Sequence, residues 1–392
     1  TALGEDTVKA VFKEGSGTKL LSLSGTPFNI LTDYDENSIY TWDYIMEQES
    51  KSEWDKLHFG DHNPYDELPE LRIYTYSLGD ILKNSHYITF EDKAFNFHEF
   101  FRTFTGDFSV DYADMPQGTD IGDFVHEADV WSFLNLMTVE DDNSQYPYSN
   151  EEYRSLFKHS LWIVPGVREA KALKKLMLKH PVFGNGMFDI VNVAGSGDEE
   201  EKSEEALSKV KRAINKAKKN DTYTITLSCG KLTTGVTIKE WTAVFMLAGS
   251  FSTSAANYLQ TIFRVQSPCN EDGKIKETAY VFDFAPDRTL KMVSSAVQIS
   301  SRAGKNKIGD KQIMGKFLNY CPVIAVLGSE MQEYSATKLL QQLKRAYADR
   351  VVQNGFDDTN LYNDELFKLD QIDIKKFDEL KVKACYGQDS LP

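Results

Sequence analysis

Cysteine is scarce in this 392-residue sequence, and its four copies lie far apart without any CxxC pair. A disulfide framework and a zinc knuckle are therefore excluded as the basis of the fold, and a cytoplasmic location is expected. No apolar run approaches the roughly 18 residues of a membrane-spanning helix. The first twenty residues also lack the order of a signal peptide. The sequence predicts a protein that has no membrane as a partner.

Positive charge is also in deficit, because 44 Lys and Arg stand against 59 Asp and Glu, a formal net charge of −15. This balance disfavours a protein that coats nucleic acid through bulk positive charge, although local basic patches remain allowed. Hydrophobic residues make up 41% of the sequence, which is ordinary globular usage and excludes disorder of the whole chain. The length predicts two to three domains.

The common nucleotide-binding and metal-binding motifs are missing as well. No G-x-x-x-x-G-K-[ST] loop occurs, since Gly15–Lys19 has the wrong spacing and precedes a strand. The loop Val193–Asp198 lacks the third glycine of a dinucleotide-binding loop, and the glutamates after it would repel a pyrophosphate. His58 and His62 lie among helix-breaking residues, which favours a solvated loop over a metal site.

Short apolar runs alternate with amphipathic helices in the second half of the chain, which is typical of βαβ units and a parallel sheet. Helices are predicted at Arg168–His180 and Glu205–Lys219, where apolar residues recur three or four apart. The strands expected in one mainly parallel sheet are Leu161–Val167, Phe188–Ala194, Tyr223–Leu227, Val244–Leu247 and Ala279–Phe284. The predicted fold class is α/β, with one domain at about residues 155–290.

The parts on either side of this domain show other patterns. The acidic and aromatic stretch 31–154 is predicted to be an inserted or connecting subdomain. Within it, Leu68–Leu78 is expected to form a strand, and Phe95–Phe104 a helix or apolar anchor in the core. Residues 291–392 are predicted to form a mainly helical C-terminal region, with a helix over Ser335–Val352.

A hydroxyl-rich segment, Ser228–Leu247, follows one buried strand and precedes another. In a parallel sheet such a loop lies at the carboxyl edge, where its amides and hydroxyls suit phosphate oxygens. The alternative is a Thr-rich turn with local hydrogen bonds.

Two further segments carry polar residues suited to a site. In Ser254–Pro268, Gln260 and Arg264 lie four residues apart on one helical face, from which an arginine can reach a phosphoryl group. An ordinary surface ion pair is the alternative. Ser24 and Thr26 stand where the strand Lys19–Phe28 ends before a proline, which is also compatible with a plain turn.

Together the three segments resemble motifs of superfamily-two helicases and translocases, most closely the motor subunits of restriction enzymes. Ser24–Phe28 resembles motif III, Ser228–Ile238 resembles motif V, and Gln260–Arg264 resembles motif VI. The resemblance covers residues 19–30 and about 155–290, and it lies in the order and spacing of the motifs. It implies a RecA-like parallel sheet with flanking helices, in which residues 1–30 end a first RecA-like domain and 155–290 form the second.

The resemblance also implies roles for individual residues. Arg264 would be an arginine finger supported by Gln260, and together they would be the catalytic residues. The implied nucleotide contacts are Gly235, Thr237 and Arg264, and the implied DNA-binding or coupling residues are Ser24, Thr26, Ser228 and Thr234. No metal ligand is implied. ATP and Mg²⁺ would serve the complete protein, bound mainly by the first domain. DNA and attached nuclease or methyltransferase domains or subunits are the expected partners.

The sequence departs from the motifs at three positions. Phe263 stands where motif VI has a glycine, Ser267 where it has a second arginine, and Thr237 where motif V commonly has an acidic or amide residue. Part of the role of Arg264 could therefore pass to a neighbour such as Arg288. No DExH or DExD box is present either, so the chain is expected to be the C-terminal portion of a larger motor and inactive alone.

The sequence thus predicts the C-terminal part of an ATP-dependent DNA helicase or translocase of a restriction or other DNA-defence system. A non-catalytic RecA-like scaffold that binds nucleic acid or a protein partner is an alternative that the sequence leaves open. An unrelated α/β nucleotide-binding enzyme is a third.

Overall fold

A computed structural model describes most of the first 338 residues. The described residues are 21–24, 35, 38–77, 95–109, 115–140, 144–195, 199–230, 237–249, 255–271, 273–286, 288–290, 292–293, 310–327, 330–335 and 337–338. Most of the predicted helix Ser335–Val352 and most of the predicted strand Lys19–Phe28 therefore lie outside them.

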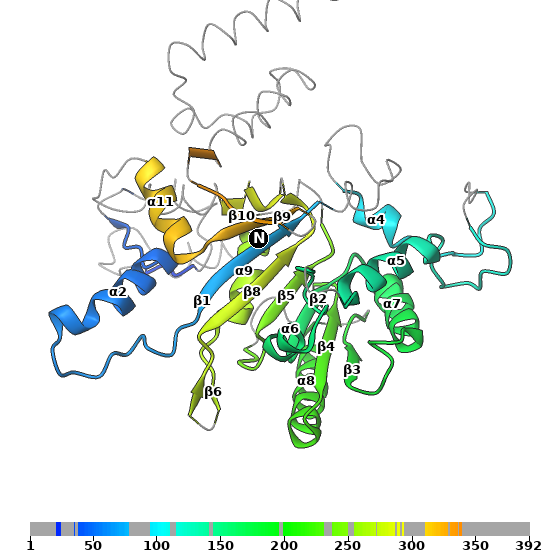
Figure 1. The fold of residues 1–392 in the computed structure, drawn as a ribbon, viewed down its shortest axis with the longest axis horizontal. Helices are drawn as coiled ribbons and strands as arrows, with labels where there is room; N and C mark the ends of the chain where they lie inside the picture. Colours follow the sequence, from blue (N-terminus) through cyan, green and yellow to red (C-terminus); the bar gives the residue numbers. More distant parts are fainter. Residues whose placement is uncertain are drawn as a thin grey trace, which may run out of the picture.

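Eight strands form one sheet in the order β10-β9-β1-β8-β5-β2-β4-β3 (Figure 1). All neighbouring pairs are parallel except β9 and β10 at one edge. The strands are β1 (Glu70–Tyr76), β2 (His159–Ile163), β3 (Phe188–Asn192), β4 (Tyr223–Ser228), β5 (Ala243–Met246), β8 (Thr278–Asp283), β9 (Val323–Leu327) and β10 (Glu330–Glu333). A separate hairpin joins β6 (Asn270–Glu271) to β7 (Lys274–Ile275).

Helices cover the sheet on both faces, and for this reason β2, β4 and β5 are buried along their whole length. One face packs against α4 (Phe97–Phe100), α5 (Glu127–Thr138) and α7 (Val167–Lys179). The other packs against α2 (Tyr44–Leu57), α8 (Glu199–Asn220), α9 (Ala255–Ile262) and α11 (Asp310–Tyr320). The short α6 (Glu151–Leu156) directly precedes β2, and the 3₁₀ turn η4 (Phe263–Gln266) continues α9.

The predicted α/β class is confirmed: the protein has a mainly parallel sheet with flanking helices. All five expected strands take part in it, and the two helices expected between them form α7 and α8. Alternate residues of each strand face opposite sides, as Leu161 and Trp162 do in β2. The predicted packing of the Phe95–Phe104 segment in the core is also found, since Phe97 and Phe100 are buried on the α7 face.

The sheet extends beyond the stretch 155–290 that predicted its core. The expected strand at Leu68–Leu78 is present as β1, and it pairs with β8 on one side and β9 on the other. A segment expected to belong to an inserted or connecting subdomain therefore supplies a central strand. At least two strands, β9 and β10, come from the region expected to be mainly helical. In the described part of the chain, no helix is long and apolar enough to cross a membrane.

The start of β2 holds a buried histidine whose protonation is coupled to folding. The Nδ1 atom of His159 lies 2.9 Å from the hydroxyl oxygen of Thr224 on β4. Burial lowers the pKa of His159 from 6.5 to about 4, and nearby Lys218 acts in the same direction. The neutral imidazole is therefore the form that the fold stabilises.

We expect His159 to make the protein less stable as the pH falls from about 6.5 towards 4. In that range the unfolded chain binds a proton at this residue and the folded chain does not. His159→Gln should remove this dependence, so the difference in unfolding free energy between wild type and variant should change by about 2 kcal/mol between pH 7 and pH 5. Urea denaturation of both proteins measures it, and parallel pH profiles would contradict the assignment.

Candidate functional site

The motif V segment begins where β4 ends. Ser228 is the last residue of β4 and is fully buried, and its carbonyl oxygen accepts a hydrogen bond of 2.8 Å from the amide of Val164. Two residues later, Gly230 has a φ of +96°, which favours glycine and lets the chain turn sharply. Thr237 is exposed, whereas Thr234 and Gly235 lie outside the described residues. The carboxyl edge of β4 thus leads directly into the predicted phosphate-binding loop.

The motif VI segment lies along α9 and η4. Gln260 is on α9 and Arg264 is on η4, and both side chains are half-buried. Burial lowers the pKa of Arg264, but a guanidinium remains protonated in proteins. Tyr258 of α9 contacts Asp283 at the carboxyl end of β8, and Arg264 lies six residues further along the chain. It offers a partly desolvated positive charge, which suits a phosphoryl group.

A buried polar network fixes α9 to this edge of the sheet. The Tyr258 hydroxyl donates a hydrogen bond of 2.9 Å to Oδ2 of Asp283, the last residue of β8. Arg288 forms an ion pair with Asp283, with 2.5 Å between Nη2 and Oδ1. The guanidinium also donates to the carbonyl oxygens of Met246, at 3.0 Å, and Ala248. One arginine therefore joins the ends of β5 and β8 to α9.

Each charge of this network is compensated. A third side chain, Thr289, also donates a hydrogen bond to Asp283, of 2.9 Å from its hydroxyl. Burial opposes the charge of Arg288, but Asp283 outweighs burial and holds the pKa of Arg288 above its ordinary value. Burial, reinforced by Asp283, also raises the pKa of Tyr258 well above its ordinary value, so the hydroxyl stays protonated and donates. The guanidinium carbon lies 5.3 Å from the ring centre of Phe97.

The suggestion that Arg288 could share the role of Arg264 is wrong in this structure. The Arg288 side chain is 1% exposed, and its donors are used within the fold. Releasing it to a ligand would leave Asp283 buried without its partner, which is strongly unfavourable. Arg288 is a structural residue.

The two departures from motif VI have structural explanations. The ring of Phe263, at the glycine position, stacks on Tyr44 of α2 with 6.0 Å between ring centres. Ser267, at the second arginine position, donates from its hydroxyl to the carbonyl oxygen of Arg264 at 3.3 Å and so closes the 3₁₀ turn. Both positions contribute to packing and turn formation around Arg264.

Other predicted site residues are only partly placed. Ser24 is exposed, and Thr26 lies outside the described residues. Within the described ranges, no group of three or more His, Cys, Asp and Glu side chains could hold a metal ion. The assigned roles of all the motif residues remain predictions.

Sequence reasoning missed Tyr258 and Asp283. An aspartate at the end of an apolar strand, followed five residues later by an arginine, was the available signal, because a buried carboxylate requires a partner. Tyr258 gave no such signal, since a tyrosine on an amphipathic helix is typical of a residue in the hydrophobic core.

A comparison with curated proteins finds one close similarity. The chain is 30% identical over 346 residues to the "Putative type II restriction enzyme and methyltransferase RM.MpnORF110P C-terminus" of Mycoplasma pneumoniae. The match covers 85% of this chain and 46% of the relative, so the chain spans about half the length of the curated relative it matches. No family model matches the chain. The resemblance to restriction-system proteins, first indicated by the motifs, is confirmed by this relative.

Solved structures give weaker likenesses. The ATP-dependent Type ISP restriction-modification enzyme LlaBIII, bound to DNA, has a TM-score of 0.36 and 16% identity, over 74% of this chain and 17% of that one. A variant of S. cerevisiae Dbp5, bound to RNA and ADP BeF3, has a TM-score of 0.29 and 11% identity, over 78% and 53% of the two chains. Both TM-scores are low, so these are distant likenesses.

We predict that Arg288→Ala lowers the unfolding free energy by about 3–5 kcal/mol, because it strands the buried Asp283 carboxylate. Arg72→Ala is the matched control: its pair with Glu70 is exposed and 3.8 Å long, and its loss should cost about 1 kcal/mol or less. Tyr258→Phe removes a single hydrogen bond and should cost about 1–2 kcal/mol while the protein still folds. Urea denaturation measures all three, and equal losses for Arg288→Ala and Arg72→Ala would refute the role of the network.

Proposed function

We propose that this chain is the C-terminal part of an ATP-dependent DNA helicase or translocase of a restriction or other DNA-defence system. The observation that carries the proposal is the order of the motif residues on the sheet. Ser228 ends β4 and β5 follows along the chain. Gln260 then lies on α9 and Arg264 on η4. This is the order that the resemblance to superfamily-two motors requires. The 30% identity to a restriction enzyme and methyltransferase supports the same assignment.

In the proposed mechanism, this sheet is the second of two RecA-like domains in the complete protein. The first would hold ATP and Mg²⁺, and ATP supplies the phosphoryl group that is transferred to water. The loop after Ser228 would bind the phosphate backbone of DNA and the nucleotide. Arg264 would stabilise the negative charge that develops on the phosphoryl oxygens, with Gln260 supporting it. Closure on ATP and opening after hydrolysis would move the protein along DNA.

In this proposal, the buried polar network of Tyr258, Asp283 and Arg288 positions the motif VI residues. Arginine fingers act only when the guanidinium is held in position before the reaction. Tyr258 is two residues before Gln260 on the same helix, and its hydrogen bond to Asp283 anchors α9 to the end of β8. Gln260 and Arg264 are thus positioned through the ends of β5 and β8.

The second candidate function is a non-catalytic RecA-like scaffold that binds nucleic acid or a protein partner. Phe263 and Ser267 favour it, because the residues at two motif VI positions pack against Tyr44 and close a turn, respectively. In a scaffold, Arg264 would have no catalytic role.

The kinetics of two variants in the complete protein separate the two functions. If Arg264 is an arginine finger, Arg264→Ala should lower kcat by about 10³-fold or more with little change in ATP affinity. Arg264→Lys should restore little activity, because an ammonium lacks the planar, two-pronged contact. Thr234→Ala should weaken the stimulation of ATP hydrolysis by DNA and leave basal turnover closer to normal. ATPase rates with and without DNA measure these effects.

The contrary result is equally specific. DNA-stimulated turnover close to wild type in Arg264→Ala would remove the finger assignment and favour the scaffold. Thermal unfolding of each variant is the control, since a kinetic defect counts only in a folded protein.

A further inference from the structure

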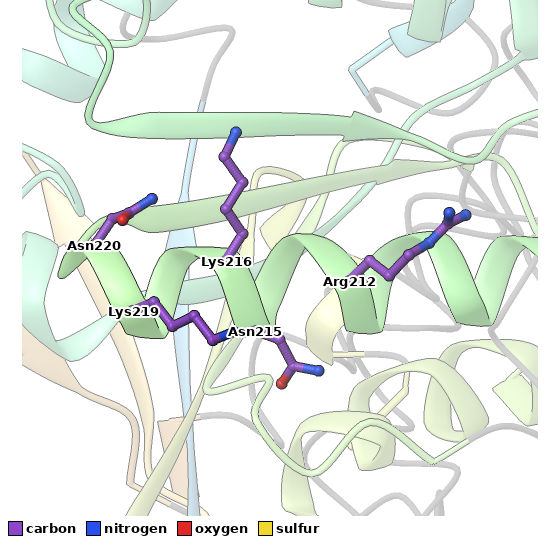
Figure 2. A pocket seen from close by; sticks show the side chains of 5 residues that line it. All are labelled: Arg212, Asn215, Lys216, Lys219 and Asn220. Atoms are coloured by element: carbon purple, nitrogen blue, oxygen red, sulfur yellow. The ribbon is translucent and has the colours of Figure 1, made fainter.

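The carboxyl-terminal half of α8 is a strongly basic helix on an acidic protein. Residues 209–220 contain six Lys and Arg and no Asp or Glu, although the whole chain has a net charge of −15. We name as the basic face of α8 five exposed residues that line a shallow pocket of about 320 Å³: Arg212, Asn215, Lys216, Lys219 and Asn220 (Figure 2). All five side chains project from the same helix.

Stabilisation of the helix does not account for this face. Cations favour the last turn of a helix, which explains Lys218 and Lys219, but Arg212 is two turns from the end. Lys218 is paired with Glu240 and Glu271, and Lys216 lies 3.7 Å from Asp189.

Two of the cations carry charge that the fold does not neutralise. Among the residues that the structure describes, no acidic side chain lies within ion-pair distance of Arg212 or Lys219. Arg212 and Lys216 are four residues apart, a spacing at which like charges destabilise a helix by about 0.2–0.5 kcal/mol. The basic face therefore slightly opposes folding, which favours a role in binding.

The basic face lies apart from the candidate site. Val210, Ile214 and Ala217 bury the opposite side of α8 in the protein core. The helix ends at Asn220, just before the amino end of β4, whereas the motif V loop follows the other end of that strand. The six residues of β4 separate the motif V loop from the Asn220 end of the basic face by about 20 Å.

We propose that the basic face of α8 binds the sugar–phosphate backbone of duplex DNA without sequence preference, as a second contact beside the motif V loop. From Arg212 to Lys219 the helix rises about 10 Å. One DNA strand carries a phosphate about every 3.4 Å along the axis, so this length matches about three phosphates and the face offers three cations. Asn215 and Asn220 add neutral amide donors of the kind that bind phosphate oxygens. The choice of DNA as the polyanion rests on the proposed function.

The test is the salt dependence of DNA binding by the 392-residue chain. The triple variant Arg212→Gln, Lys216→Gln and Lys219→Gln should reduce the slope of log K against log salt concentration by about 3, because each lost phosphate contact removes about 0.9. At 50 mM salt, affinity should fall on the order of 10²–10³-fold. Fluorescence anisotropy with a labelled duplex of arbitrary sequence measures both quantities.

The matched control makes the same change of charge on the other face of the sheet, in the variant Lys171→Gln, Lys174→Gln and Lys179→Gln on α7. It should change the slope by less than about 1. Three results would each overturn the proposal. They are an unchanged salt slope in the α8 variant, an equal reduction of the salt slope in the α7 variant, and no duplex binding by wild type. Tighter binding of poly-L-glutamate than of DNA by wild type would overturn the choice of DNA.

Failure of this inference can be told apart from failure of the proposed function. The α8 variant is tested by binding without ATP, and Arg264→Ala by turnover in the complete protein. A reduced salt slope in the α8 variant together with normal turnover in Arg264→Ala would support DNA binding by the basic face and remove the arginine-finger assignment. An unchanged salt slope in the α8 variant together with a large loss of turnover in Arg264→Ala would support the arginine finger and contradict DNA binding by the basic face.

Discussion

The buried ion pair between Asp283 and Arg288 is the constraint on which the site's arrangement depends. Removing two charges from water costs several kcal/mol for each ion, and attraction between them repays it only with good geometry and further hydrogen bonds. Here those bonds come from Tyr258 and Thr289 to the carboxylate, and from the guanidinium to backbone carbonyls at the end of β5 and just after it. A displaced α9 would lose a partner of the carboxylate, so the network selects one position of this helix.

The aromatic face of the sheet supports the same edge. The ring centres of Phe245 and Phe282 on adjacent strands are 4.6 Å apart, and Trp162 stacks on Phe245 at 4.8 Å. Such contacts make β2, β5 and β8 a rigid layer, because buried rings fill space and resist displacement. Asp283 ends β8, and Arg288 donates a hydrogen bond to the end of β5. Apolar packing beneath and polar contacts at the edge therefore act together to hold α9.

The elements of residues 155–290 were predictable from local patterns, and the arrangement of the segments on either side was not. Local sequence patterns predict elements whose neighbours lie nearby in the sequence. Examples are the buried run Tyr223–Leu227 and the helical periodicity of Glu205–Lys219. The strand at Leu68–Leu78 was also visible, but its position was not, since its partners are β8 and β9. The motif residues were found by spacing. Tyr258 was missed because its partner in space leaves no mark on the local sequence, whereas Asp283 was missed although Arg288, five residues later, was an available signal.

The central position of β1 has a consequence for the making of this protein. Its pairing of Glu70 with Thr278 closes a loop of roughly 200 residues, and pairing with β9 closes a longer one. At about 5–20 residues per second, a ribosome needs roughly 10–40 s to produce β8 after β1 has emerged. During that time β1, with the apolar Leu71 and Ile73, has neither sheet neighbour, which makes it a point where a nascent chain needs protection from aggregation.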